Sequence, residues 1–153
     1  MQVKLNQTDK VKRNEFVLIF HPKNKELANM TKKMIEAKAG EVEVRDEFHN
    51  HFFISLLNIY YFEVIDHKVF AYTKSDVYRI HIIFHDLKKE MKTKGFIQIN
   101  VRTLVNERHI YKYEMTKGCR RKLFLDNEEC LVSNRQFKDN VDQMLKRRHV
   151  EEL

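Results

Sequence analysis

Short apolar runs broken by polar residues recur through the middle of the chain. They form four segments rich in β-branched and aromatic residues, at 51–57, 59–65, 68–72 and 77–82. The breaks between them hold turn-favouring residues, among them Asn58, Asp66 and Ser75. This pattern predicts four antiparallel strands joined by short turns.

Helical spacing follows the fourth of these strands. Phe84, Leu87 and Met91 recur at helical intervals, and Gly95 stands where such a helix would end. Residues 96–106 then carry apolar side chains on both sides of a polar break at 100–103. We expect this segment to be buried on both sides and to surface briefly in its middle, where it directs side chains outward from a fixed scaffold.

Strand-like alternation returns after residue 108. It covers residues 109–115, 119–125 and 130–132, with a turn at 126–129. Ser133 and Gln136 have the spacing of a capping box, which predicts a helix beginning at Ser133. Four residues form one apolar stripe along that helix: Phe137, Val141, Met144 and Leu145. The basic residues 146–149 are expected to be frayed.

The N-terminal part has a different pattern. Residues 1–14 are polar and lysine-rich, and we expect them to be frayed or to form a weak edge strand. Residues 16–20 are all apolar, as in a strand covered on both faces. Pro22 suits the first turn of a helix that Gly40 would end, and Val42 and Val44 alternate with charged residues as in a half-exposed strand.

These elements divide the chain into two predicted parts. Residues 1–48 form a short α/β extension, which packs against the remainder or makes a dimer contact. Residues 49–148 form one mainly β domain.

Composition favours a polyanionic partner. Lys and Arg number 29 against 22 Asp and Glu, which gives a net charge of +7. Nucleic acid and an acidic membrane surface both fit such a charge. No apolar run approaches the ~20 residues that cross a bilayer, and the first residues lack the apolar core of a signal peptide. We therefore expect a cytoplasmic protein without a membrane partner.

The sequence offers little for catalysis or metal binding. It has no glycine-rich phosphate loop and no nucleophile elbow, so we predict neither an enzyme nor a cofactor. His49 and His51 follow two carboxylates, but no second ligand group follows at a recognisable spacing, and no metal site is predicted. Cys119 and Cys130 match no zinc signature, and we expect both to be reduced.

Three polar breaks in the apolar pattern, around residues 67, 101 and 135, could instead contact nucleic acid. Arg binds guanine through two donors, Asn pairs with adenine, and Lys or His reaches groove edges and phosphates. A helix starting at Ser133 would also offer unpaired amides to a phosphate. The candidate DNA-binding residues are His67 and Lys68, Asn100 and Arg102, and Asn134 and Arg135. The residues alone leave open whether the three breaks share one face.

Several motifs occur in an order typical of one family. The segments are 60–73, 96–106 and 132–137, and the most specific pieces are Leu104-Val105-Asn106 and Val132-Ser133-x-Arg135. From about residue 59 to residue 145 the chain resembles the LytTR family of bacterial DNA-binding domains. The resemblance implies a mainly β (α+β) fold of stacked antiparallel sheets. It also implies loops that enter successive major grooves of double-stranded DNA and bend it, usually as a pair of subunits on direct repeats.

The resemblance also assigns residues by position. His67, Asn100 with its neighbours, and Arg135 match the family's DNA contacts. Where the family tends to have a basic residue followed by Ser, this chain has Val101 and then Arg102. In a regular strand that shift would turn the charge to the other face, so Arg102 is a weaker candidate than Arg135.

We therefore predict a transcriptional regulator that binds specific sequences of double-stranded DNA, as a homodimer at least on DNA. The part before residue 49 is too short for a receiver domain, so the chain resembles the stand-alone regulators of the family. Two alternatives remain open. One is an RNA- or single-strand-binding β module with aromatic platforms. The other is a protein-interaction module whose basic residues only confer solubility.

Overall fold

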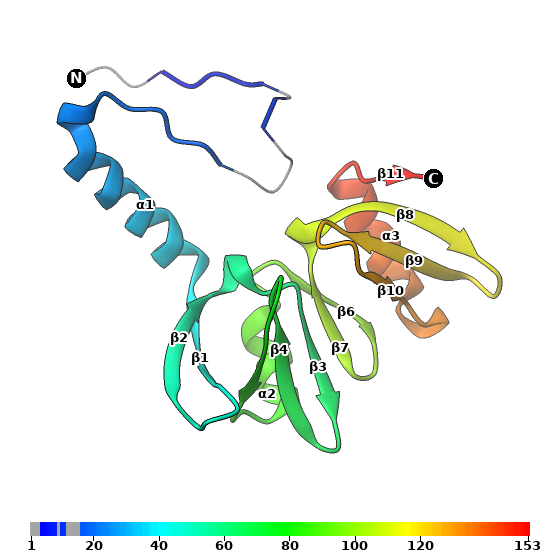
Figure 1. The fold of residues 1–153 in the computed structure, drawn as a ribbon. Helices are drawn as coiled ribbons and strands as arrows, with labels where there is room; N and C mark the ends of the chain where they lie inside the picture. The colour runs from blue at the N-terminus through cyan, green and yellow to red at the C-terminus, as the bar shows by residue number, and fades with distance from the viewer. Residues whose placement is uncertain (1–3, 9, 12–15) are drawn as a thin grey trace.

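A computed structural model describes residues 4–8, 10–11 and 16–153, and the side chains of these except 36–39. Its strands lie in a seven-stranded sheet, ordered β2-β1-β5-β4-β3-β7-β6, and a four-stranded sheet, ordered β10-β9-β8-β11 (Figure 1). The fold is mainly β, which confirms the predicted class.

Every neighbouring pair in the larger sheet is antiparallel. Its strands are β1 (Glu41–Arg45), β2 (His51–Ser55), β3 (Tyr61–Ile65), β4 (Lys68–Tyr72), β5 (Val77–Ile80), β6 (Phe96–Asn100) and β7 (Thr103–Asn106). Of the four predicted strands, β3, β4 and β5 form the antiparallel meander, with β4 at the predicted bounds. The first, β2, does not pair with β3 as predicted, because it lies at the edge of the sheet beside β1. The short helix η2 (Leu56–Asn58) joins β2 to β3, and α2 (Phe84–Met91) lies between β5 and β6 as predicted.

The smaller sheet follows β7 along the chain. Its strands are β8 (Ile110–Thr116), β9 (Arg120–Leu125), β10 (Cys130–Val132) and β11 (Glu151–Glu152). Neighbours are antiparallel except β11, which runs parallel to β8. Two short helices, η3 (Glu107–His109) and η4 (Arg135–Phe137), and the longer α3 (Lys138–Arg147) complete this half.

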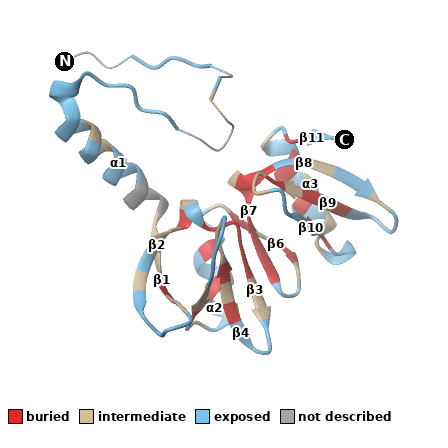
Figure 2. Cartoon of the chain, in the orientation of Figure 1, coloured by how far each residue is buried: buried red, intermediate tan, exposed pale blue. Residues whose placement is uncertain are grey.

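The β6–β7 hairpin separates two hydrophobic cores. Phe96 and Leu104 belong to the core that α2 covers, together with its Leu87. Ile99 and Val105 belong to the second core, which β8, β9 and α3 complete. Figure 2 shows buried positions along both strands. The predicted burial on two sides is confirmed, because successive strand residues point to opposite faces.

The end of β7 is fixed by one buried amide. The Asn106 side chain has no exposed surface. Its Nδ2 donates to the carbonyl oxygens of Leu56 at 3.1 Å and Ile59 at 2.8 Å. Its Oδ1 accepts the Arg108 amide at 3.1 Å. Asn106 therefore holds η2 against the turn that leads to the smaller sheet.

The N-terminal part differs from its prediction in one element. Residues 16–20 belong to no sheet, and Ile19 is 94% exposed. The predicted helix is present as η1 (Pro22–Asn24) and α1 (Lys25–Ala39), and it ends at Gly40, whose φ is +89°. The strand predicted around Val42 and Val44 is β1, which joins the larger sheet beside β5.

The larger sheet therefore includes strands on both sides of the predicted domain boundary at residue 48. The division into two domains stays a prediction. Residues 4–8 and 10–11 form no strand, and the remainder of the segment 1–14 lies outside the described residues.

The predicted capping box is wrong. The Ser133 hydroxyl is fully buried and accepts the Arg121 amide at 3.0 Å, while the Ser133 amide donates to the Arg121 carbonyl oxygen at 2.8 Å. Ser133 thus continues the pairing with β9, because this cross-strand partner takes up the hydroxyl that a cap would need. The α-helix begins only at Lys138, after η4.

The expected fraying of residues 146–149 is also wrong. α3 continues through Arg147, whose guanidinium donates to the Glu107 carboxylate at 2.7 Å. Val150 is buried, and β11 then pairs with β8. The apolar stripe on α3 is confirmed, since it packs into the second core.

Asn106→Ala should lower the free energy of unfolding by about 2–3 kcal/mol, because two buried carbonyls lose their donor. Urea denaturation measures this change. Asn140→Ala, at an exposed position on α3, is the control and should change stability by less than ~0.5 kcal/mol. Equal stability of the two variants would contradict the role assigned to Asn106.

Candidate nucleic-acid interface

The three polar breaks lie side by side at one edge of the molecule. The Val64 amide on β3 donates to the Arg102 carbonyl oxygen at 2.9 Å, which joins the β3–β4 and β6–β7 hairpins near their turns. The Asn134 amide donates to the Ile99 carbonyl oxygen at 2.8 Å, which joins the β10–η4 segment to β6. In Figure 1 the β3–β4 turn is lowest, the β6–β7 turn follows it, and η4 lies beyond.

The β3–β4 turn is a tight two-residue connection. Ile65 and Lys68 are paired across it, and Asp66 and His67 have φ values of +48° and +60°. Two successive positive φ angles are typical of the type I′ turn, which matches the twist of a hairpin. The exposed His67 and Lys68 side chains therefore stand at the tip of a well-defined hairpin.

The β6–β7 turn is shaped by Asn100. Its Oδ1 accepts the Arg102 amide at 2.8 Å, and Gln98 Nε2 donates to the Asn100 carbonyl oxygen at 2.9 Å. A bulge lies between Gln98 and Asn100. The side-chain oxygen of Asn100 is therefore occupied within the turn, and its Nδ2 remains available as a hydrogen-bond donor.

Arg102 is better placed than the sequence suggested. Val101 and Arg102 form the tip of the turn rather than part of a strand, and both side chains are exposed. The one-place shift of the charge therefore does not send Arg102 to the opposite face of a sheet. Val101 adds an exposed apolar group, of a kind that can contact a thymine methyl group.

The third segment, from β10 to η4, is supported by an ion pair between β9 and α3. The buried Arg121 guanidinium donates from Nε to Asp142 Oδ1 at 2.8 Å and from Nη2 to Oδ2 at 3.0 Å, which ties β9 to α3. Asn134 and Arg135 then emerge with exposed side chains, and Asn134 makes no side-chain capping bond to η4. The phosphate site predicted at a helix beginning at Ser133 is not formed, because α3 starts further along.

The strand pairing adds basic residues that the sequence reading missed. Arg45 on β1 lies opposite His51 on β2 and Arg79 on β5, so these three residues share one face of the larger sheet. The pairing of β1 with β5 joins segments far apart in sequence. No local pattern could have indicated it.

These residues continue the edge that carries the β3–β4 turn. His67, Lys68, Arg79 and His81 line a shallow hollow of about 250 Å³. The buried Nε of Arg79 has no hydrogen-bond partner within the described part of the chain. Desolvation, and then the nearby charges of Arg45 and Arg79, lower the pKa of His81. The hollow is thus a basic surface with unused donors, as a phosphate site requires.

The structure also places the histidines and cysteines that the sequence raised as metal-ligand candidates. His51 Nδ1 lies 2.7 Å from Glu43 Oε1. Residues 4–8, 10–11 and 16–153 include no group of three or more His, Cys, Asp or Glu that could hold a metal ion. Cys119 and Cys130 are free and exposed, and burial raises the pKa of the Cys130 thiol.

Within the same residues no helix has the length and apolar character needed to span a membrane.

Comparison with known proteins identifies the fold that carries this edge. The family model for the LytTr DNA-binding domain matches residues 49–146. The chain belongs to the LytTR family. The LytTR family consists of DNA-binding domains rather than enzymes, and the match covers all three of the turns described above.

A solved structure has the same fold as this LytTR chain. It is the LytTr DNA-binding domain of a protein described as a methyl-accepting/DNA response regulator from Bacillus cereus. The two superimpose with a TM-score of 0.63 and 15% identity, over 69% of this chain and 95% of that one. No curated protein matches the chain.

Proposed function

We propose that this LytTR protein regulates transcription in the bacterial cytoplasm by binding specific sequences of double-stranded DNA. The three adjacent turns enter successive major grooves and bend the duplex between them. The observation that carries this proposal is the row of exposed polar tips along one edge, joined to one another by backbone hydrogen bonds. A row of exposed tips on a β scaffold suits a duplex better than an extended single strand.

Each tip has a distinct chemical role in the proposal. Arg135 donates two hydrogen bonds to a guanine, and Asn134 and Asn100 donate to base edges. Lys68 and Arg102 bind phosphates and set the position of the protein on the duplex. His67 contacts a base edge or the backbone beside Lys68. The basic hollow with Arg79 and His81 takes a further phosphate.

A pair of subunits extends the contact over a direct repeat. One subunit presents one edge and therefore covers one half-site. Two linked subunits bind with an effective concentration that raises affinity well above that of either alone. We therefore propose a homodimer on DNA.

The aromatic side chains around β3 are buried, which argues against the single-strand alternative at this edge. Phe48 and Phe53 are exposed, but they lie on the β1–β2 hairpin. Stacking platforms need exposed rings, but Tyr60, Tyr61 and Phe62 are buried. Tyr61 stacks on Tyr72, with ring centroids 4.3 Å apart, inside the fold.

Arg135→Ala should weaken binding to the cognate duplex by ~1–3 kcal/mol and relax the preference at one base pair. Lys68→Ala should weaken cognate and scrambled duplexes equally and reduce the salt slope by about one. Fluorescence anisotropy with both duplexes at several salt concentrations measures these effects. Lys94→Ala, at an exposed position just before β6 and so at the end of that strand opposite the β6–β7 turn, is the control. Unchanged binding by both test variants would refute the assignment of these tips to DNA.

DNA affinity should also rise as the pH falls from about 8 to about 6, in part through His81. The pKa of His81 is lowered in the free protein by desolvation and by Arg45 and Arg79. A nearby phosphate favours the charged imidazolium and raises this pKa, so binding takes up a proton. Because a complex that takes up a proton is favoured at low pH, His81→Gln should flatten the pH dependence measured by anisotropy. An equal slope in the variant and the native protein would show that His81 does not face the DNA.

A further inference from the structure

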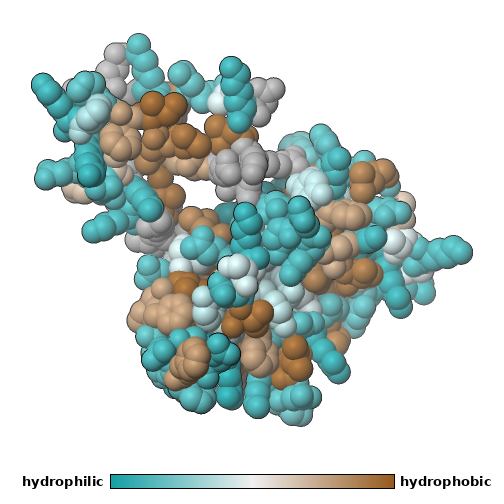
Figure 3. Space-filling view, in the orientation of Figure 1, coloured by the Kyte–Doolittle hydropathy of each residue, from teal (hydrophilic) through white to brown (hydrophobic). Residues whose placement is uncertain are grey.

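The N-terminal unit, defined as residues 16–39, exposes an unusually large apolar surface. The arm, residues 16–20, has five large apolar side chains that are all exposed, and four more follow on α1: Leu27, Met30, Met34 and Ile35. Figure 3 shows this surface gathered around a hollow between the unit and the remainder of the molecule. Scattered apolar residues are normal on a protein surface, but a contiguous patch of this size marks an interface.

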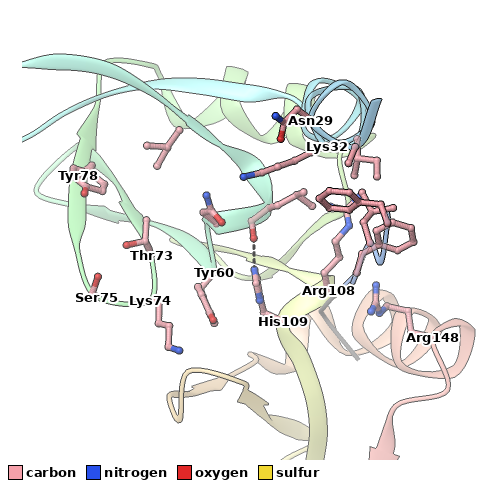
Figure 4. A pocket seen from close by; sticks show the side chains of 18 residues that line it. Asn29, Lys32, Tyr60, Thr73, Lys74, Ser75, Tyr78, Arg108, His109 and Arg148 are labelled. Atoms are coloured by element: carbon pink, nitrogen blue, oxygen red, sulfur yellow. Dashed lines mark hydrogen bonds between the residues drawn. The ribbon is translucent and has the colours of Figure 1, made fainter. Parts of the chain in front are cut away.

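The arm is apolar on both of its sides. Phe16, Leu18 and Phe20 line a cavity of about 1190 Å³, whose opposite wall includes Ile54 and Tyr60. Figure 4 shows Asn29 and Lys32 extending from α1 at one side of this cavity, and Tyr60 and His109 at the other. The alternate residues Val17 and Ile19 are not among the lining residues and are exposed. The arm is therefore apolar on two sides, and the described part of the chain covers only part of one.

The arm also lacks a strand partner. Its sequence is that of a strand buried on both faces, but it belongs to no sheet in the described part of the chain. Helix α1 contacts the body at β2 and η2, and its Leu27, Met30 and Met34 side chains are exposed and belong to neither core. Within the described residues, the arm and helix α1 therefore both present exposed apolar side chains that no partner covers.

We propose that two copies of the chain associate through their N-terminal units about a two-fold axis, the arm of each covering the apolar stripe and groove of the other. This inference names the surface of the homodimer proposed above and rests on that proposal. A two-fold interface uses the same patch on both copies. Because one chain carries both the arm and the groove, each copy can insert its arm into the groove of the other.

The size of the patch agrees with what a stable dimer buries. Scaled on about 200 Å² for a large apolar side chain, the exposed fractions amount to roughly 1,000 Å² per copy. Stable interfaces bury about 800 Å² per partner. The apolar residues are flanked by Lys23, Lys25 and Lys33, so two copies repel each other electrostatically until salt screens the charges.

Sedimentation velocity of the full chain without DNA tests the proposal over concentrations of about 1–100 µM. The native protein should be a dimer that persists or strengthens when salt is raised from about 0.15 to about 0.5 M. Ile19→Asp and Met34→Asp should each raise the dimer dissociation constant at least ~10-fold, because an unpaired carboxylate is buried in the interface. Both positions are exposed in the single chain, so these variants should keep the native circular dichroism spectrum.

Met115→Asp is the matched control, since Met115 is exposed on β8 far along the chain from the unit. It should leave the dissociation constant unchanged. A native protein that stays monomeric throughout, or an equal loss of dimer in Met115→Asp, would overturn the proposal. A monomer that co-sediments with anionic phosphatidylserine vesicles at low salt, and releases them at high salt, would overturn it in favour of a membrane surface. Because no DNA is present, any of these outcomes leaves the proposed DNA contacts standing.

Discussion

The β6–β7 hairpin must satisfy two hydrophobic cores at once. One set of its side chains packs under α2, and the other set packs against the smaller sheet and α3. A shift of one residue in its register would exchange the two sets and would move the Asn106 amide away from the carbonyl oxygens of Leu56 and Ile59. The double burial therefore fixes the register of the hairpin, and with it the position of the turn at Val101 and Arg102.

That fixed hairpin positions the other two tips. Its backbone accepts the Val64 amide on one side and the Asn134 amide on the other, so the three turns form a continuous row. The rigid parts that hold them differ: a type I′ turn for His67, an Asn100 turn for Arg102, and the Arg121 pairing behind Arg135. Because the scaffold already holds the three turns in place, little conformational entropy is lost when they bind a ligand. This favours specific binding.

Local patterns predicted most elements but few of the long-range pairings. Alternation and helical spacing located β4 at its observed bounds, and α2 within one residue. The capping box predicted at Ser133 is not formed, because the Ser133 hydroxyl accepts the amide of Arg121, which lies on another strand. The strand predicted at residues 16–20 is not formed for a related reason: a strand needs a neighbour, and the described part of the chain does not provide one. Arg79 and His81 stayed hidden because their proximity to Lys68 depends on sheet register.

The central claim is that one edge of the fold, and not the other, meets DNA. Strands β3 and β7 each run between this edge and the opposite end, which holds η2 and η3. Amide chemical shifts of the ¹⁵N-labelled protein, titrated with its cognate duplex, distinguish the two ends residue by residue. The largest changes should fall at residues 66–68, 100–102 and 134–135. Changes concentrated at residues 56–58, 107–109 and 126–128, with the three turns unaffected, would contradict the account.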